Sequence, residues 1–148
     1  MSANPAVSAG DEAQLRDMID QWRDAVRRKD IDALLQHYSP RLVSFDAWGA
    51  LSNPLSVYRE HWEACFNGHD GPLEFGHHDL QLTVGERVAF CHCIIELGGT
   101  MVDGTKHRFR GRGTICFEKV DGRWQVTHEH ASAPFDPMTG QVKGDLDA

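Results

Sequence analysis

The sequence lacks any apolar run of about 20 residues, which is the length that a helix needs to cross a bilayer. Its first ten residues, MSANPAVSAG, also lack the basic start and the apolar core of a signal peptide. We therefore expect a cytoplasmic protein that does not have a membrane as its partner.

Positive charge is also scarce, because 15 Lys and Arg residues stand against 22 Asp and Glu residues. The resulting net charge of −7 repels phosphate backbones and removes the electrostatic attraction on which nucleic-acid binding depends. Nucleic acid is therefore not an expected partner.

Cysteines in metal-binding arrangements are missing as well. The four cysteines, Cys65, Cys91, Cys93 and Cys116, all have apolar neighbours, which is typical of buried free thiols. Cys91 and Cys93 are separated by one residue, and no matching second pair accompanies them. We therefore expect neither disulfides nor a metal site.

With 148 residues, the chain has the length of one ordinary domain, and it shows no internal repeat or interdomain linker. We expect a flexible N-terminus over residues 1–10 and one domain over residues 11–134. Residues 135–148 contain few apolar anchors, and we expect them to form a loose C-terminal tail.

Hydrophobic periodicity and turn residues predict three helices followed mainly by strands. Asp-Gly pairs between apolar runs mark hairpin turns, and a set of long sequential strands after the helices favours an α+β fold. The helices should cover one face of an antiparallel sheet. The predicted helices are Asp11–Arg28, Asp30–Tyr38 and Leu55–Phe66, and the predicted strands are Arg41–Asp46, Leu73–Val84, Arg87–Leu97, His107–Lys119 and Trp124–Ala133.

This order of elements, together with the segment DGRWQVTHEHAS at residues 121–132, resembles one large superfamily. It includes ketosteroid isomerases, polyketide cyclases of the SnoaL type and nuclear transport factor two. The resemblance spans roughly Asp11 to Pro134, and the pattern D-G-x-W-Q-x-x-H-x-H-x-S is similar to the association domain of calcium/calmodulin-dependent kinases. The resemblance implies a cone-shaped α+β barrel, in which a curved antiparallel sheet and N-terminal helices enclose a mostly apolar cavity. It also implies a homodimer through the outer face of the sheet.

Asp46 is the first candidate for chemistry. Its spacing from Tyr38 and Gly49 matches the ketosteroid isomerase segment in which an aspartate is the proton-shuttling base. Burial at the mouth of an apolar cavity would raise the pKa of such a carboxyl toward neutral pH. The alternative is an aspartate that ends a strand and caps the next turn.

The match to a steroid isomerase then breaks. Trp22 occupies the position of the oxyanion-hole tyrosine, and Ile115 or Cys116 occupies that of the protonated aspartic acid. None of them is the strong donor that the isomerases use, an arrangement that is well known for that enzyme. The sequence therefore disfavours a steroid isomerase.

His92 has the same strand parity as Phe90 and Ile94. The resemblance puts it where kinase association domains have a pocket arginine, so it could exchange a proton or hold a carboxylate. The alternative is a core histidine bonded to a backbone carbonyl.

His128 and His130 are expected to share one face of the last strand with Trp124, Val126 and Ser132. We interpret them as acid/base or hydrogen-bonding groups, since no third metal ligand lies at a diagnostic spacing. They could instead brace the sheet or the dimer face. Parity alone does not say which face lines the cavity.

Arg110 and Arg112 lie on one face of a predicted strand and could clamp an anionic ligand if that face reached the cavity. Otherwise they belong to a solvated or inter-subunit face. His77 and His78, at the start of a strand, are interpreted as surface residues. The aromatic residues expected to line the cavity are Trp22, Tyr38, Trp48, Trp62 and Phe66.

These patterns predict a SnoaL-type isomerase, dehydratase or cyclase that works by acid/base chemistry without a metal or organic cofactor. Asp46 would be the general base, and His92, His128 and His130 would be acids or orienting donors for a small apolar or weakly acidic ligand. Such a site needs a cavity of roughly 300 Å³ or more. The competing hypothesis is a noncatalytic ligand-binding or oligomerisation module like the kinase association domain.

Overall fold

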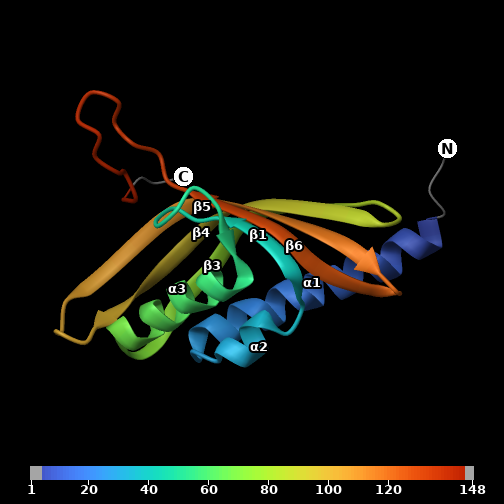
Figure 1. Cartoon of the computed structure of the whole chain (residues 1–148), viewed down its shortest axis with the longest axis horizontal. Helices are drawn as coiled ribbons and strands as arrows, with labels where there is room; N and C mark the ends of the chain where they lie inside the picture. Colours follow the sequence, from blue (N-terminus) through green and yellow to red (C-terminus); the bar gives the residue numbers. More distant parts are fainter. Residues whose placement is uncertain (1–4, 146–148) are drawn as a thin grey trace.

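The computed structural model describes residues 5–145. These residues form three helices and six strands, with two of the strands between α2 and α3 and the other four after α3. Figure 1 shows all three helices on one side of the curved sheet. The elements are α1 (Pro5–Arg27), α2 (Ile31–Leu35), β1 (Tyr38–Phe45), β2 (Asn53–Pro54), α3 (Leu55–Gly68), β3 (His69–Val84), β4 (Val88–Met101), β5 (Lys106–Val120) and β6 (Arg123–Ser132).

Helix α1 buries the apolar stripe that its sequence predicts. Leu15 and Val26 have no exposed surface, and Met18 and Ile19 are almost as deeply buried. The helix begins already at Pro5, so Asp11 lies inside the helix and not at its start, where the sequence predicts it. The carboxylate of Asp11 instead accepts hydrogen bonds from Lys119 Nζ at 2.9 Å and Trp124 Nε1 at 3.0 Å. This contact fastens α1 to the hairpin between β5 and β6.

Helix α2 is short, and Asp30 is its N-cap. The side chain of Asp30 accepts a hydrogen bond from Ala33 N at 3.0 Å, which satisfies one free amide of the first turn. The helix ends at Leu35, earlier than predicted, because Tyr38 already begins β1.

The six strands form one sheet in the order β2-β1-β6-β5-β4-β3. Every neighbouring pair is antiparallel except β1 and β6, which run parallel. The predicted α+β fold with a curved sheet and covering helices is confirmed. The sheet is open, with β2 and β3 at its edges, so it does not close into a barrel.

Alternation along β4 defines two faces of the sheet. Ala89, Cys91 and Cys93 are buried on the inner face, under the helices, whereas Phe90 and His92 are exposed on the outer face. The core therefore lies between the inner face and the apolar sides of α1, α2 and α3. None of the helices between residues 5 and 145 is long and apolar enough to span a membrane.

A β-bulge interrupts β6. Phe117 on β5 pairs with Val126, but the preceding residue Cys116 pairs with His128, so Thr127 is one extra residue on β6. Such an extra residue reverses the side-chain alternation of everything beyond it.

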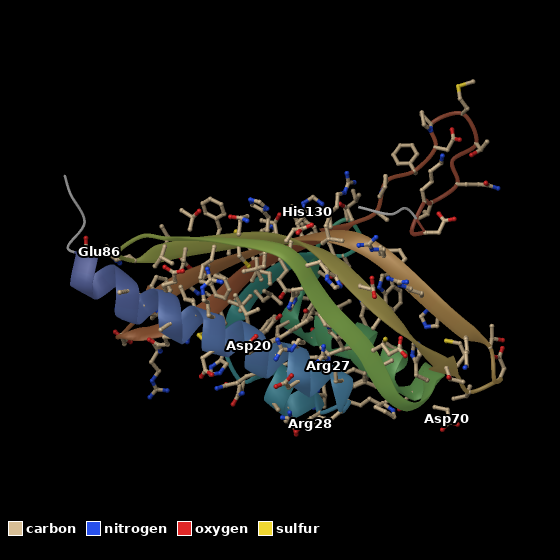
Figure 2. The ribbon with its side chains drawn as sticks, turned by 180° about the vertical axis from the view of Figure 1, so that it is seen from behind. Asp20, Arg27, Arg28, Asp70, Glu86 and His130 are labelled. Carbon is tan, nitrogen blue, oxygen red and sulfur yellow. The ribbon has the colours of Figure 1, made fainter. Side chains whose placement is uncertain are left out.

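The bulge corrects the predicted faces of the last strand. Trp124 and Val126 are buried on the inner face, while His128 and His130 lie on the outer face. Figure 2 shows His130 on the side of the sheet away from the helices. Glu129, between the two histidines, is the residue that turns inward.

The segment after β6 leaves the body of the domain (Figure 1). It turns back on itself through a bridge between Phe135 and Val142, and it is tied to β5 by a 2.7 Å hydrogen bond from Arg110 N to Gly144 O.

Candidate functional site

A narrow cavity lies between α1, α2 and the inner face of the sheet. Its walls are mostly apolar, and the polar side chains among them are those of Trp22, His37, Tyr38, His77 and Glu129. The cavity volume that the centre of a water molecule can occupy is about 20 Å³. This is room for about one water, so the expected cavity of roughly 300 Å³ is not formed in this conformation.

Glu129 is the carboxyl group of this cavity. Tyr38 donates a hydrogen bond to Glu129 Oε1, and the hydroxyl oxygens of Tyr38 and Tyr58 are 3.1 Å apart. Both tyrosines are buried, and their rings stack at a centroid distance of 5.3 Å. A carboxyl group on a strand thus meets one hydroxyl from the first strand and one from α3.

Burial raises the pKa of Glu129 to about 7, and the negative charge of Asp46 acts in the same direction. Hydrogen bonds from Tyr38 and Tyr58 favour the ionised form and lower this pKa. Burial is the larger effect. Glu129 can therefore gain or lose a proton near neutral pH, as a general acid or base must.

His77 and Trp22 supply further polar groups to the same cavity. Burial lowers the pKa of His77 to about 4, helped by the charge of Arg23, so its imidazole is neutral at pH 7. The Trp22 indole lies against His77 with ring centroids 5.5 Å apart. Its Nε1–H is buried and has no hydrogen-bond partner among the described residues. A ligand oxygen in the cavity would supply the missing acceptor.

Asp46 lies just after β1 and does not line the cavity. Its carboxylate accepts hydrogen bonds from Ser44 Oγ, from Asn53 Nδ2 at 3.2 Å and from His61 Nδ1 at 2.7 Å. Trp48 stacks on the His61 ring at a centroid distance of 4.1 Å. The predicted candidate base is therefore held in a separate polar cluster.

The structure does not bring the predicted histidines to Asp46. His92, His128 and His130 are all on the outer face, and the expectation that they share a cavity with Asp46 is wrong. For His92 the cause is strand parity, because its odd-numbered neighbours on β4 face inward. For His128 and His130 the cause is the bulge at Thr127. His128 Nδ1 hydrogen-bonds the backbone oxygen of Val43 at 2.6 Å.

The predicted arginine clamp is also on the outer face. Arg110 pairs with Glu96 on the neighbouring strand at 3.4 Å, and Arg112 Nε donates to Ser132 Oγ at 3.2 Å. Neither side chain is among those that line the cavity. Arg112 is exposed on this face, whereas the Arg110 side chain is only 18% exposed.

The aromatic predictions divide between cavity and core. Trp22 and Tyr38 line the cavity, whereas Trp62 and Phe66 do not. Trp62 packs edge-on against Trp22 at 5.4 Å and touches Phe66, which is buried in the core. Trp48 is 55% exposed and belongs to the Asp46 cluster.

Sequence reasoning missed Glu129, Tyr58, His61 and His77. The bulge at Thr127 places Glu129 on the inner face, which regular alternation from Trp124 does not predict. Alternation does indicate that Glu129 lies on the face opposite to His128 and His130. His77 was interpreted as a surface residue, but its alternation with buried Phe75 and Leu73 could have placed it on the inner face. Tyr58 and His61 fall within the predicted helix Leu55–Phe66, and nothing in its spacing marks them as site residues.

Metal-ligating side chains do not cluster in the part of the chain that the structure describes. Within residues 5–145, no group of three or more His, Cys, Asp or Glu residues is placed to hold a metal ion.

Comparisons with known proteins agree with this architecture. The family model of the SnoaL-like domain matches residues 15–136. An NTF2-like protein of unknown function from Pseudomonas putida KT2440 is 34% identical, with a TM-score of 0.86 over 95% of this chain and 99% of that chain. No curated protein matches the sequence.

More distant solved structures share the fold. The NTF2-like superfamily protein from Salmonella enterica serovar Typhimurium is 14% identical, with a TM-score of 0.75 over 95% of this chain and 100% of that chain. The association domain of C. elegans CaMKII is 16% identical, with a TM-score of 0.66 over 84% of this chain and 97% of that chain. The family match and the 34% identical relative show that the chain belongs to the SnoaL-like domain family.

Proposed function

We propose that this protein binds a small, mainly apolar organic molecule in the cavity and transfers a proton through Glu129. It would act as a cofactor-independent isomerase, dehydratase or cyclase. The observation that carries this proposal is a carboxyl group with a pKa of about 7 in a cavity that is otherwise mostly apolar. Perturbed carboxyl groups of this kind concentrate at sites of acid/base catalysis.

The unpaired Trp22 Nε1–H supports a ligand that carries an oxygen atom. Proton removal from a carbon next to a carbonyl places negative charge on the carbonyl oxygen, which a buried donor stabilises. Neutral His77 and Tyr38 offer further hydrogen bonds to such a ligand. The ligand class is therefore a small ketone, enol or other weakly acidic carbonyl compound.

Binding requires the cavity to open, because the closed form holds about one water. At the surface, Gln21 on α1 contacts the segment that follows α2. Gln21 Oε1 is 3.1 Å from His37 Nε2 and accepts a hydrogen bond from Gln36 Nε2 at 3.3 Å. Exposed polar contacts of this type contribute little stability. Separation of α1 from the segment after α2 is the expected route of entry.

Deuterium exchange into 2-tetralone tests the proposal, because its acidic C–H groups lie next to a carbonyl. The wild-type protein should accelerate exchange in D₂O, measured by NMR, and Glu129→Gln should lower the rate by about 100-fold or to the buffer rate. His130→Gln, on the outer face, is the matched control and should keep the wild-type rate. Exchange that survives Glu129→Gln would exclude Glu129 as the proton-transfer group.

A noncatalytic assembly module is the second candidate. It is favoured by the closed cavity and by the apolar side chains that the outer face exposes, namely Val43 (42%), Phe45 (39%), Val88 (60%) and Phe90 (45%). Exposed apolar patches mark association surfaces. A homodimer through this face is the expected assembly and is compatible with either function.

A further inference from the structure

Asp46 and His61 form a hydrogen-bonded pair outside the cavity. Their side chains are 10% and 17% exposed, respectively, and the Asp46 Oδ2 to His61 Nδ1 distance is 2.7 Å. Ser44 and Asn53 also donate to this carboxylate, so all of its contacts hold it in one orientation. Such a carboxylate fixes both the position and the tautomer of the imidazole.

The hydrogen bond determines where the proton of neutral His61 lies. Because a carboxylate can only accept, Nδ1 carries the hydrogen and Nε2 carries the lone pair. No residue in the described part of the chain hydrogen-bonds to Nε2. The backbone of Gly49 runs beside this atom, and a Cβ at that position would lie 3.2 Å from it. With the hydrogen on Nδ1, Nε2 is the ring nitrogen that can accept a proton.

An aromatic surface adjoins this base. Trp48 stacks on the His61 ring with an interplanar angle of 25° and remains 55% exposed. Leu51, on the same connection between β1 and β2, is 97% exposed. A planar apolar molecule that packs against the edge of the exposed indole lies beside the imidazole, whereas a molecule stacked on the outer face of the indole would be separated from the imidazole by the indole itself.

We propose that His61 is a general base at a second site, where it accepts the proton of a phenol or enol that packs against the edge of Trp48. The O–H bond breaks, the hydrogen moves to Nε2, and the oxygen keeps the electron pair as phenolate or enolate. The resulting imidazolium faces Asp46, which stabilises its charge. Return of the proton restores both partners, so the step needs no other reactant. His61 is the catalytic residue and Asp46 is a positioning residue.

This site does not depend on the function proposed for the cavity. Trp48, Asp46 and His61 are not among the cavity residues, and no hydrogen bond joins Glu129 to Asp46 or His61 in the described part of the chain, although the charge of Asp46 contributes to the raised pKa of Glu129. A probe can therefore distinguish the two sites.

The probe is 4-nitrophenol, whose absorption spectrum distinguishes phenol from phenolate. At a pH where the free phenol is mostly protonated, binding to the wild-type protein should raise the ratio of phenolate to phenol about tenfold, equal to one pKa unit. His61→Gln should abolish this increase, and Asp46→Asn should reduce it. Trp48→Ala should weaken binding about tenfold, while His92→Gln on the outer face should change neither quantity.

Three results would overturn the proposal: no binding at millimolar 4-nitrophenol, unchanged ionisation in His61→Gln, or loss of the ionisation in Glu129→Gln instead. The last result would place the phenol in the cavity. If a variant fails to fold, the ¹⁵N NMR spectrum of the wild-type imidazoles provides a second test. A neutral His61 with its hydrogen on Nε2 would also overturn the proposal, since Nε2 would then be unable to accept a proton.

Discussion

The hydroxyl group of Tyr38 donates a hydrogen bond to the carboxyl group of Glu129, and so joins the first long strand of the sheet to the last. The bond lies in the only parallel strand pair among the described residues, where Ser44 is the register partner of Glu129. Proton exchange at Glu129 is thereby coupled to the packing of β1 on β6.

Stability should depend on pH through Glu129. Because its pKa is raised from 4.5 to about 7 in the folded state, the native protein favours the protonated carboxyl group. This contribution is complete below pH 4.5 and is lost as the pH rises to about 7. Relative to wild type, Glu129→Gln should gain about 3 kcal/mol in unfolding free energy over that interval. Urea titrations at pH 4.5 and pH 8 measure the difference, and parallel pH profiles would contradict the prediction.

Tyr38→Phe should raise the pKa of Glu129 further. The lost hydroxyl group stabilises the ionised carboxylate, so its removal shifts the equilibrium toward the protonated form. The variant should also lose about 1–2 kcal/mol of unfolding free energy at pH 8. The ¹³C resonance of the Glu129 carboxyl group, followed against pH, reports the shift. In a double-mutant cycle with Glu129→Gln, a coupling energy near zero would show that the two groups do not interact.

Asp11→Ala should destabilise the protein by about 1–3 kcal/mol, because Lys119 and Trp124 lose their shared acceptor. The hydrogen bond from Lys119 is the main cause that lowers the pKa of Asp11, so this contribution is present above pH 3.8 and is lost as the pH falls through the lowered pKa. Chemical unfolding followed by tryptophan fluorescence measures the change. Asp17→Ala, at an exposed position on the same helix, should stay within about 0.5 kcal/mol of wild type.

Sedimentation at micromolar concentration should show a particle near twice 16.6 kDa. Phe90→Asp should convert it to a monomer, because the change puts a carboxylate into the apolar part of the outer face. Leu51→Asp changes a more exposed residue away from the strands of this face and should remain dimeric. A monomeric wild-type protein would exclude the assembly.

The fold was largely predictable because its determinants are local. Leu15, Met18 and Val26 repeat at helical spacing, and the Asp121-Gly122 turn marks the last hairpin with positive φ at both residues, +50° and +78°. These signals need no knowledge of distant residues. The open edge of the sheet and the parallel pairing of β1 with β6 are long-range features that local patterns do not encode.

The candidate site was less predictable because one extra residue decides it. Thr127 reverses the alternation of inward and outward side chains along β6, and no turn residue or glycine in that strand predicts the bulge. The reversal puts Glu129 beside Tyr38 and moves His128 and His130 to the outer face. Trp22 and Tyr38 were found because their cavity positions follow from the N-terminal segments, which contain no such irregularity.

The parallel pairing of β1 with β6 also bears on the order in which the protein becomes functional during synthesis. Tyr38 and Tyr58 leave the ribosome long before Glu129, so the cavity has no carboxyl group until β6 has been synthesised. Closing this pair spans most of the sequence, and such distant contacts form late and slow the folding of a domain. A nascent chain that stops before β6 would carry the aromatic walls exposed to its surroundings, so chaperone contact is expected at that stage.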